Sequence, residues 1–255
     1  MRSIEGEPAL ILRRTEYGES DLIVGLYCRS LGKISALARS ARRSRKRFGA
    51  GLGMFTLSEV SMQSKGRAEM WTLLSAAPRR SYESLATELG SMAQASYGTE
   101  LVRELTAPEH PEPEVFDLLA ALYESLHRDG ASVGRLRVFE LRLLASLGLA
   151  PVFAACSNCQ STALAQGAIL DPSRGGVLCQ RCAPSARGYG VRSLDPETLE
   201  YLCAAQRCTQ LRDGDRLENS RVAVDARQAM LSLLYWHVGK PLKSVEFIAK
   251  LSNKS

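Results

Sequence analysis

The stretch ESDLIVGLYCRSLGKISALA, residues 19–38, consists of two short apolar runs that the tetrapeptide Ser-Leu-Gly-Lys separates. Such runs, bounded by glycine, serine and charged residues, are typical of β-strands joined by a turn. Outward from this pair, the same pattern predicts strands over residues 9–14, 20–28, 34–41, 55–63 and 69–74. Five short strands within about 75 residues favour a small closed barrel, because closure removes the exposed edges of an open sheet.

Helical periodicity replaces the strand pattern from Tyr82 onward. Apolar residues then recur at every third or fourth position, with a break at the proline-rich segment APEHPEPE, residues 107–114. The predicted helical segments are residues 85–92, 115–126, 134–147, 196–207 and 224–238. Gly148 and Pro151 follow the third of them, as glycine and proline commonly do at a helix end.

Two Cys-x-x-Cys pairs interrupt the helical part. Cys156 and Cys159 are separated by 19 residues from Cys179 and Cys182, within the spacing of four-cysteine zinc sites. The turn-forming sequence DPSRGG, between two apolar runs, predicts a hairpin that returns the second pair to the first. Four thiolates complete a tetrahedral site without water, so we expect one structural Zn²⁺ ion in a segment too small to build its own core.

These signals predict an α+β multidomain protein. We expect a barrel domain over residues 1–80, a helical domain in two parts over 81–150 and 191–255, and an inserted zinc ribbon over 151–190. The first ten residues include three charged ones and lack the apolar core of a signal peptide. No stretch approaches the roughly 18 apolar residues of a membrane-spanning helix. We therefore expect a cytoplasmic protein without a membrane partner.

Positive charge is concentrated in the first third of the chain. Residues 1–80 hold 15 Lys and Arg against 7 Asp and Glu, whereas residues 81–150 hold 5 against 11. The run ARSARRSRKRFGAG, residues 38–51, carries six cations that repel one another unless a polyanion or solvent screens them. This run predicts a surface for the phosphate backbone of nucleic acid, with a merely solvated loop as the alternative. The predicted DNA-binding residues are Lys33, Arg39, Arg42, Arg43, Arg45, Lys46, Arg47 and Phe48. The Phe48 ring is available to stack on a base, with packing into the barrel as the alternative.

An enzymatic interpretation fits the sequence poorly. His110 and Glu112, followed by Cys156 and Cys159, resemble the outline of a zinc deaminase. That pattern requires a proline before the first cysteine, where this chain has Ala155, and it leaves the second cysteine pair without a role. The sequence has neither a Walker-type phosphate loop nor a nucleophile elbow, so we expect no enzyme. The remaining cysteines and histidines, Cys28, Cys203, Cys208, His127 and His237, are expected to be structural.

The motifs together resemble a known family. The run from Tyr17 to Val60, YGESDLIVGLYCRSLGKISALARSARRSRKRFGAGLGMFTLSEV, is similar to the N-terminal signature of RecO, the bacterial recombination mediator family. FELRLLASLGLAP, CSNC, GGVLCQRC and HVGKPLKS are similar to later landmarks of that family, in the same order. The resemblance covers nearly the whole chain.

This resemblance implies an N-terminal OB-fold barrel and a role without chemistry. It implies a protein that binds single- and double-stranded DNA, anneals complementary strands and acts with RecR. Such a protein helps RecA replace the single-stranded-DNA-binding protein SSB, whose acidic C-terminal tail is a further expected partner. Candidates for the tail contact are Arg135, Arg137 and Arg142, and Arg174, Arg181 and Arg187 make a DNA contact of the ribbon conceivable. The alternative from another class is a zinc-ribbon adaptor whose main work is protein contact.

Overall fold

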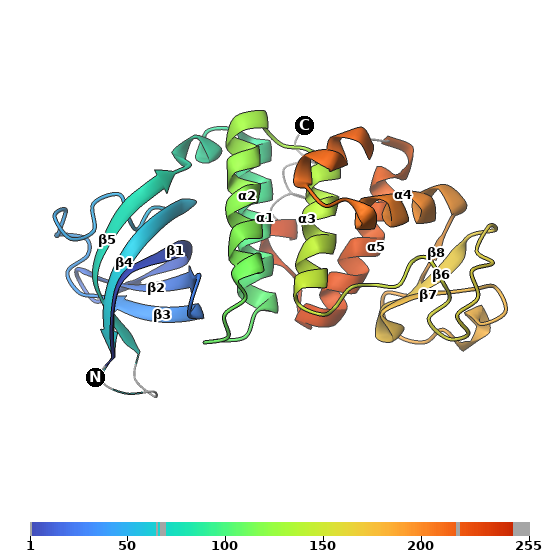
Figure 1. Cartoon of the computed structure of the whole chain (residues 1–255), viewed down its shortest axis with the longest axis horizontal. Helices are drawn as coiled ribbons and strands as arrows, with labels where there is room; N and C mark the ends of the chain where they lie inside the picture. Colours follow the sequence, from blue (N-terminus) through green and yellow to red (C-terminus); the bar gives the residue numbers. More distant parts are fainter. Residues whose placement is uncertain (1, 65, 67–69, 218–219, 247–255) are drawn as a thin grey trace. The chain divides into compact units, whose positions relative to one another are not determined.

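The computed structural model describes residues 2–64, 66, 70–217 and 220–246. The chain divides into two compact units, residues 1–130 and 131–255. The first unit contains a β-barrel and a pair of α-helices. The second contains further α-helices and a small sheet (Figure 1). The helical pair is therefore grouped with the barrel. The sequence pattern instead predicts that residues 81–150 belong to a helical domain separate from a barrel domain of residues 1–80.

The barrel consists of five strands. They are β1 (Arg2–Tyr17), β2 (Asp21–Cys28), β3 (Gly32–Ala38), β4 (Thr56–Ser64) and β5 (Trp71–Ser81). The strands close in the order β1-β2-β3-β5-β4, and all neighbours are antiparallel except β3 and β5. Side chains along β4 alternate between buried and half-buried positions, as expected of a strand with one face on a core. The predicted barrel is thus confirmed, and it closes through two residue pairs between β3 and β5, Ala36 with Trp71 and Leu37 with Thr72.

Two strands extend beyond their predicted limits. The C-terminal half of β1 pairs with β2, from Ala9 to Tyr17, while its N-terminal half pairs with β4, from Arg2 to Leu10. The two pairings overlap only around residues 9 and 10. The polar N-terminal half of β1 lacks an apolar pattern and is extended because it pairs with β4. β5 likewise continues to Ser81 because β4 pairs with it along its whole length. Glu69, the first residue of the predicted fifth strand, lies outside the described residues.

The helical pair of the first unit follows a 3₁₀ turn at Glu83–Ala86. It consists of α1 (Leu89–Leu105) and α2 (Pro113–Asp129). The Glu88 carboxylate accepts hydrogen bonds from the N–H groups of Gly90 and Ser91 and so caps α1. The ring of Tyr123 in α2 lies 5.5 Å from Phe55 and 5.8 Å from Tyr82, and burial raises the pKa of its hydroxyl. Aromatic packing thus joins α2 to the open end of the β4-β5 hairpin, where the start of β4 pairs with the end of β5.

The second unit begins with α3 (Val133–Ser146), which ends before Gly148 as predicted. Strands β6 (Ala168–Asp171), β7 (Gly176–Leu178) and β8 (Arg192–Leu194) form an antiparallel sheet in the order β7-β6-β8. The sheet is followed by α4 (Pro196–Arg207), a 3₁₀ segment (Leu211–Leu217) and α5 (Ser220–Val238). The predicted helical region with an inserted cysteine-bearing hairpin is confirmed.

Close backbone approach fixes the start of α3. A Cβ atom on Gly134 would lie 2.1 Å from the carbonyl oxygen of Gly214, so only glycine fits there. Beside this contact, the Arg135 guanidinium donates to the Asp215 carboxylate, with Nε 2.8 Å from Oδ1. Within the described ranges, no helix has both the length and the apolar character needed to cross a membrane.

Candidate functional site

The six cations of residues 39–47 lie on the connection between β3 and β4. We call residues 39–47 the basic loop; it lies at the left of Figure 1. The loop begins where the Asp21 carboxylate accepts the N–H of Ser40, with an N to Oδ1 distance of 2.7 Å. It ends where the carbonyl of Arg47 accepts the N–H of Ala76 in β5, at 2.9 Å. These bonds hold both ends of the loop against the barrel.

Two residues beyond the basic loop anchor it further. Phe48 is buried in the barrel core with an exposed fraction of 2%. A Cβ atom on Gly51 would lie 2.2 Å from the carbonyl oxygen of Ala76, so the chain passes β5 too closely for any other residue. The Ser58 hydroxyl donates to the Gly51 carbonyl at 2.6 Å. The loop is therefore a supported surface feature.

The cations of the basic loop differ in how firmly they are held. All six side chains are exposed. Arg42 lies 3.4 Å from Glu16 and Arg43 lies 3.9 Å from Glu19, and such exposed ion pairs are weak. Arg39, Arg45 and Lys46 form no ion pair with any carboxylate in the described part of the chain.

Arg47 has a different position from its neighbours. Its guanidinium donates to the carbonyl of Arg39 at 2.7 Å and to the hydroxyl of Ser44 at 3.1 Å. Its central carbon also lies 4.9 Å from the centroid of the Phe48 ring. Arg47 thus closes the loop on itself and covers the ring that anchors it.

Phe48 requires a correction of its expected role. Its ring packs among barrel residues that include Val24, Leu26 and Met62, and only 2% of the residue is exposed. A ring in this position has no free face for a base. Stacking was considered because the residue follows the cations in sequence, but the chain turns there and the apolar side chains of Phe48 and Leu52 pack into the core.

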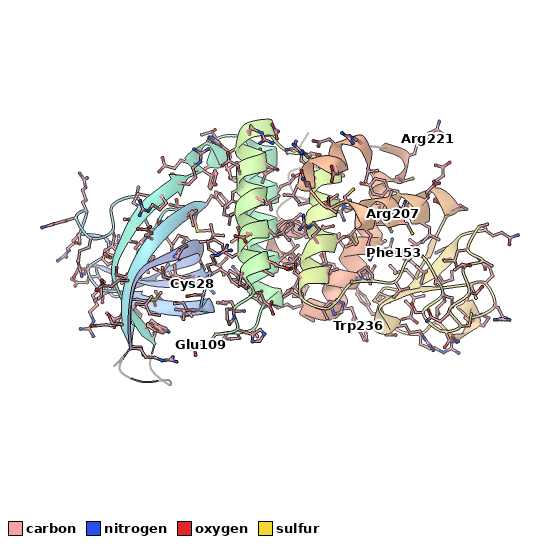
Figure 2. The ribbon with its side chains drawn as sticks, in the orientation of Figure 1. Cys28, Glu109, Phe153, Arg207, Arg221 and Trp236 are labelled. Carbon is pink, nitrogen blue, oxygen red and sulfur yellow. The ribbon has the colours of Figure 1, made fainter. Side chains whose placement is uncertain are left out.

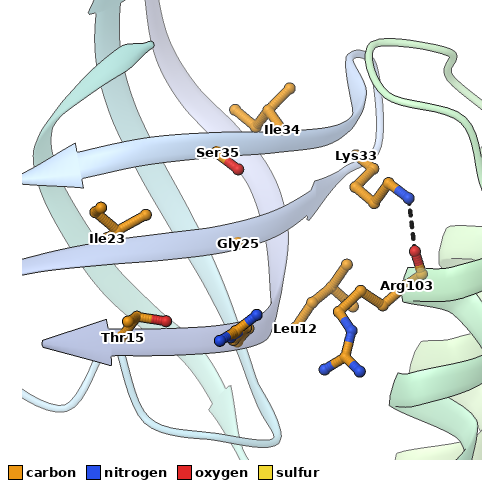
Figure 3. A pocket seen from close by; sticks show the side chains of 9 residues that line it. Leu12, Thr15, Ile23, Gly25, Lys33, Ile34, Ser35 and Arg103 are labelled. Carbon is orange, nitrogen blue, oxygen red and sulfur yellow. Dashed lines mark hydrogen bonds between the residues drawn. The ribbon is translucent and has the colours of Figure 1, made fainter. Parts of the chain in front are cut away.

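Lys33 also differs from its expected place on the loop. It lies at the opposite end of β3, roughly 20 Å from Arg39 at about 3.3 Å per strand residue. Its ammonium donates to the carbonyl of Arg103, at 2.6 Å, and to that of Thr106, at the C-terminal end of α1. The first of these bonds is drawn in Figure 3. Lys33 therefore caps a helix, where a cation is favoured by the helix dipole.

Figure 3 also shows the pocket of about 280 Å³ beside Lys33. Leu12, Ile23 and Ile34 give it apolar walls, with hydroxyls from Thr15 and Ser35. The Arg103 guanidinium at its rim pairs with Glu100, at 3.2 Å, and with Glu104, at 2.9 Å. Arg13 also lines the pocket, while the other two cations, Lys33 and Arg103, are engaged within the protein, and we assign no ligand to it.

The four cysteines of the second unit meet as predicted. The Sγ atoms of Cys156, Cys159, Cys179 and Cys182 all lie within 4.8 Å of one another. The first pair is joined to the sheet through the Ser157 N–H, which donates to the Val177 carbonyl at 2.8 Å. The second pair follows β7 directly, so the β6-β7 hairpin carries the two pairs together. The cluster is positioned to hold a metal ion.

The surroundings of the cluster favour a cation. Burial raises the pKa of Cys156, but the backbone N–H groups of Cys179, Cys159 and Asn158 outweigh it and lower that pKa from 9.0 to about 6. The Asn158 amide lowers the pKa of Cys182, yet burial and the other sulfurs raise it more, to about 11. Four thiolates so close together repel one another, and a divalent cation would remove this conflict. The four cysteine sulfurs are therefore suitable ligands for a divalent metal ion that four thiolates coordinate.

Two polar neighbours of the cluster were not identified from the sequence as residues of the candidate metal site. Asn158 donates from Nδ2 to Cys182 Sγ at 3.4 Å and accepts a bond from Arg174 at 3.1 Å. The backbone N–H of Ser161 and, after it, the Arg181 guanidinium lower the pKa of the Cys159 thiol, and Cys159 in turn raises the pKa of Arg181. Their position inside or beside a Cys-x-x-Cys motif is the signal that could have identified them, because such residues surround the metal.

The other candidate residues lie apart from the cluster. Cys28 is fully buried in the barrel (Figure 2), and burial raises its pKa, whereas Cys203 and Cys208 are half-buried. His110, from the deaminase interpretation, is exposed and lies 3.3 Å from Glu112. These positions agree with structural or surface roles.

The three arginines considered for the SSB tail are all engaged. Arg135 pairs with Asp215, as described above, and Arg137 pairs with Glu140, with 4% and 0% of those two side chains exposed. Arg142 is exposed and donates to the carbonyl of Thr209. None of them offers an unengaged guanidinium, so we assign no tail contact to these residues.

Comparison with known proteins gives matches along nearly the whole chain. The family model described as "Recombination protein O N terminal" matches residues 1–82, and the one described as "Recombination protein O C terminal" matches residues 86–246. A protein of Anaeromyxobacter sp. (strain K) named "DNA repair protein RecO" is 34% identical over 249 residues, 95% of this chain and 94% of the relative. Proteins of the same name from Syntrophotalea carbinolica and Myxococcus xanthus are 34% and 32% identical, over 97% and 96% of this chain and 95% and 97% of the relatives.

Proposed function

This chain belongs to the RecO family of DNA repair proteins, which are noncatalytic recombination mediators, and from that premise we propose that it binds and anneals DNA through the basic loop. The observation that carries the proposal is the set of six exposed cations on a loop anchored at both ends to the barrel. Three of these cations, Arg39, Arg45 and Lys46, form no ion pair within the described residues. An anchored row of cations reduces the conformational entropy lost when a phosphate backbone binds.

The proposed activity needs no reaction centre. Two complementary strands repel each other through their phosphates, and cations that screen this repulsion allow them to approach. Base pairing then supplies the sequence specificity, so the protein has no need to read base edges. Both single-stranded and double-stranded DNA would bind, because the contacts are to the backbone.

We further propose that the cluster metal is one structural Zn²⁺ ion. Four cysteines with no open coordination position are typical of structural zinc. The residues that would hold it are Cys156, Cys159, Cys179 and Cys182, and it would supply the cross-link that a three-stranded sheet this small lacks. The ribbon would thereby stay folded beside α5.

The partners are proposed from family membership. They are RecR, the C-terminal tail of SSB and, as the recipient of the exposed strand, RecA, in the cytoplasm of a bacterial cell. We place none of their contacts on particular residues, because the arginines first considered for the tail are engaged within the second unit.

An annealing assay tests this proposal. Complementary oligonucleotides, bare or coated with SSB, are mixed with the full chain, and duplex formation is followed with and without the SSB tail. The test variant carries Arg39→Gln, Arg45→Gln and Lys46→Gln. A control with Arg128→Gln, Arg207→Gln and Arg221→Gln, all outside the basic loop, has the same net charge.

The wild type and the control should accelerate annealing of bare strands, and the loop variant should not. On coated strands, removal of the SSB tail should slow the wild type if the tail is a partner. Annealing by the loop variant at the wild-type rate would contradict the DNA-binding role of the loop and favour a zinc-ribbon adaptor.

A further inference from the structure

The second unit has an exposed aromatic residue that neither the core nor the metal cluster uses. Tyr189 is 80% exposed, the largest exposed fraction among the large apolar side chains of the described residues. It lies in the loop Ser185-Ala-Arg-Gly-Tyr-Gly190, between the second cysteine pair and β8. A single exposed apolar side chain is common on protein surfaces, so a function for Tyr189 depends on what lies beside it.

Contacts on both sides of Tyr189 hold it outward. Gly188 and Gly190 both have positive φ, at 103° and 83°, which directs the chain through a sharp turn. On one side, the N–H of Arg187 donates to the buried carboxylate of Asp171 at 3.3 Å. On the other, a Cβ atom on Gly190 would lie 3.2 Å from Cβ of Ser232 in α5. The tyrosine is therefore presented at the tip of an anchored turn.

A second exposed aromatic residue lies near this turn. Trp236 follows Ser232 by one helical turn on the same face of α5, and it is 47% exposed (Figure 2). Helical side chains lean toward the helix N-terminus, so the indole covers the turn that contains Ser232. Because Gly190 packs on Ser232, the backbone at Gly190 and the Cβ of Trp236 are roughly 10 Å apart, given about 5 to 6 Å between side chains one turn apart.

The segment that carries Tyr189 is positively charged. Residues 168–194 contain four arginines and a single acid, Asp171. Asp171 is fully buried and accepts bonds from Ser173 and Arg187, so it does not face solvent. Arg181 is engaged by Cys159. The exposed Arg187 guanidinium donates from Nη1 to the carbonyls of Pro184, at 2.7 Å, and Ala186, at 2.8 Å, so it is held on the loop that carries Tyr189, and Arg192 donates from Nε to Ser232 at 3.2 Å. Two cations therefore flank the aromatic pair.

From this arrangement we propose that Tyr189 and Trp236, flanked by Arg187 and Arg192, form a stacking platform for unpaired bases of a DNA strand. Aromatic faces combined with a few cations are the usual means of holding single strands, and stacking tolerates any sequence. The inference rests on the proposed function, because it takes the ligand to be DNA, but it assigns a second contact on a different unit.

The platform has a signature that backbone binding lacks. Bases in a duplex are already stacked on one another, so the platform should bind single strands and leave duplex affinity unchanged. The basic loop, which contacts phosphates, should affect both. Strand type therefore separates the two surfaces.

The test measures binding of the full chain to a fluorescent oligothymidine and to a duplex of equal length. Tyr189→Ala should weaken single-strand binding about fivefold or more, since one stacked base contributes on the order of 1 to 3 kcal/mol, and duplex binding should not change. Tyr189→Phe keeps the ring and should bind as the wild type does. The exposure of Tyr189 means that its replacement should leave the metal content and the fold intact.

Tryptophan fluorescence gives an independent readout. The chain has two tryptophans, and Trp71 is buried in the barrel with 4% exposed. In a Trp71→Phe background, the single strand should quench the emission of Trp236, and the duplex should not. If Trp71→Phe perturbs the barrel, comparison of quenching in the wild type and in Trp236→Phe gives the same information.

Three outcomes would overturn the platform. Tyr189→Ala could bind single strands as the wild type does while the basic-loop variant loses both DNA types, which would leave the proposed function in place. Equal losses for single strands and duplex would mean a backbone contact in place of stacking. Loss of binding to RecR or to SSB with unchanged DNA binding would make the surface a protein-docking site. Absence of DNA binding by the wild type would instead contradict the proposed function itself.

Discussion

Neutralising Arg39, Arg45 and Lys46 together is the most informative perturbation of the basic loop. These three cations form no ion pair with the described residues, so each is available to a phosphate. Arg42 and Arg43 must first leave Glu16 and Glu19, and Arg47 is bonded to the loop backbone. The three unengaged cations should therefore release the most counterions when a strand binds.

The magnitude follows from counterion release. Each phosphate contact with a single strand contributes about 0.7 to the slope of log affinity against log salt, so the triple Gln variant should lose about 2 from this slope. Between about 50 and 200 mM salt, the affinity of the wild type should then fall roughly 20-fold more than that of the variant. The assay is a titration of a fluorescent oligothymidine at four or more salt concentrations.

The acids beside the loop provide a perturbation of opposite sign. Glu16→Gln and Glu19→Gln would free Arg42 and Arg43, so affinity should increase and the slope should steepen by up to about 1.4 for two further contacts. The charge-matched control at Arg128, Arg207 and Arg221 should leave the slope unchanged. A folded loop variant with the wild-type slope would refute the assignment of this surface.

Three further predictions separate structural from binding roles. Lys33→Met should lower the free energy of unfolding by about 2 kcal/mol in urea titrations, because two helix-end carbonyls lose a charged donor. The slope of log DNA affinity against log salt should not change. A changed slope would mean that Lys33 belongs to the DNA-binding surface. Phe48→Leu should cost about 1 to 2 kcal/mol of barrel stability without weakening single-strand binding, and a selective loss of binding would show that the ring stacks after all. Cys156→Ser should abolish stoichiometric zinc in elemental analysis, whereas Cys203→Ser should retain it. Acidification should release the metal, because protons compete with it for the thiolates. Wild-type protein without bound metal would refute the site.

The existence of the five strands was predictable because each strand is a local pattern. Alternation and bounding glycines or polar residues place the runs at residues 20–28 and 55–63 within a residue or two of β2 and β4. The full length of β1 was not predictable, since its polar N-terminal half is extended only through pairing with β4. That pairing joins residues about 50 positions apart, and no local pattern encodes it.

The cysteine cluster could be identified for a similar reason. Only Cys156, Cys159, Cys179 and Cys182 have the paired spacing that four-thiolate sites require, and the structure brings all four together. Cys203 and Cys208 lack that spacing and lie on and after α4, apart from the cluster. Residue type and interval were sufficient here because metal coordination restricts both.

The sequence by itself determined which residues carry the chemistry of this protein, namely four thiols at metal-binding intervals and six cations in one short run. The tertiary structure alone decided which of them are available. It directs Phe48 into the barrel core, bonds Lys33 to the end of α1 and leaves Tyr189 exposed on its turn. The reason is physical: composition and spacing are local properties of the chain, whereas burial and charge pairing depend on distant segments that meet only when the chain folds.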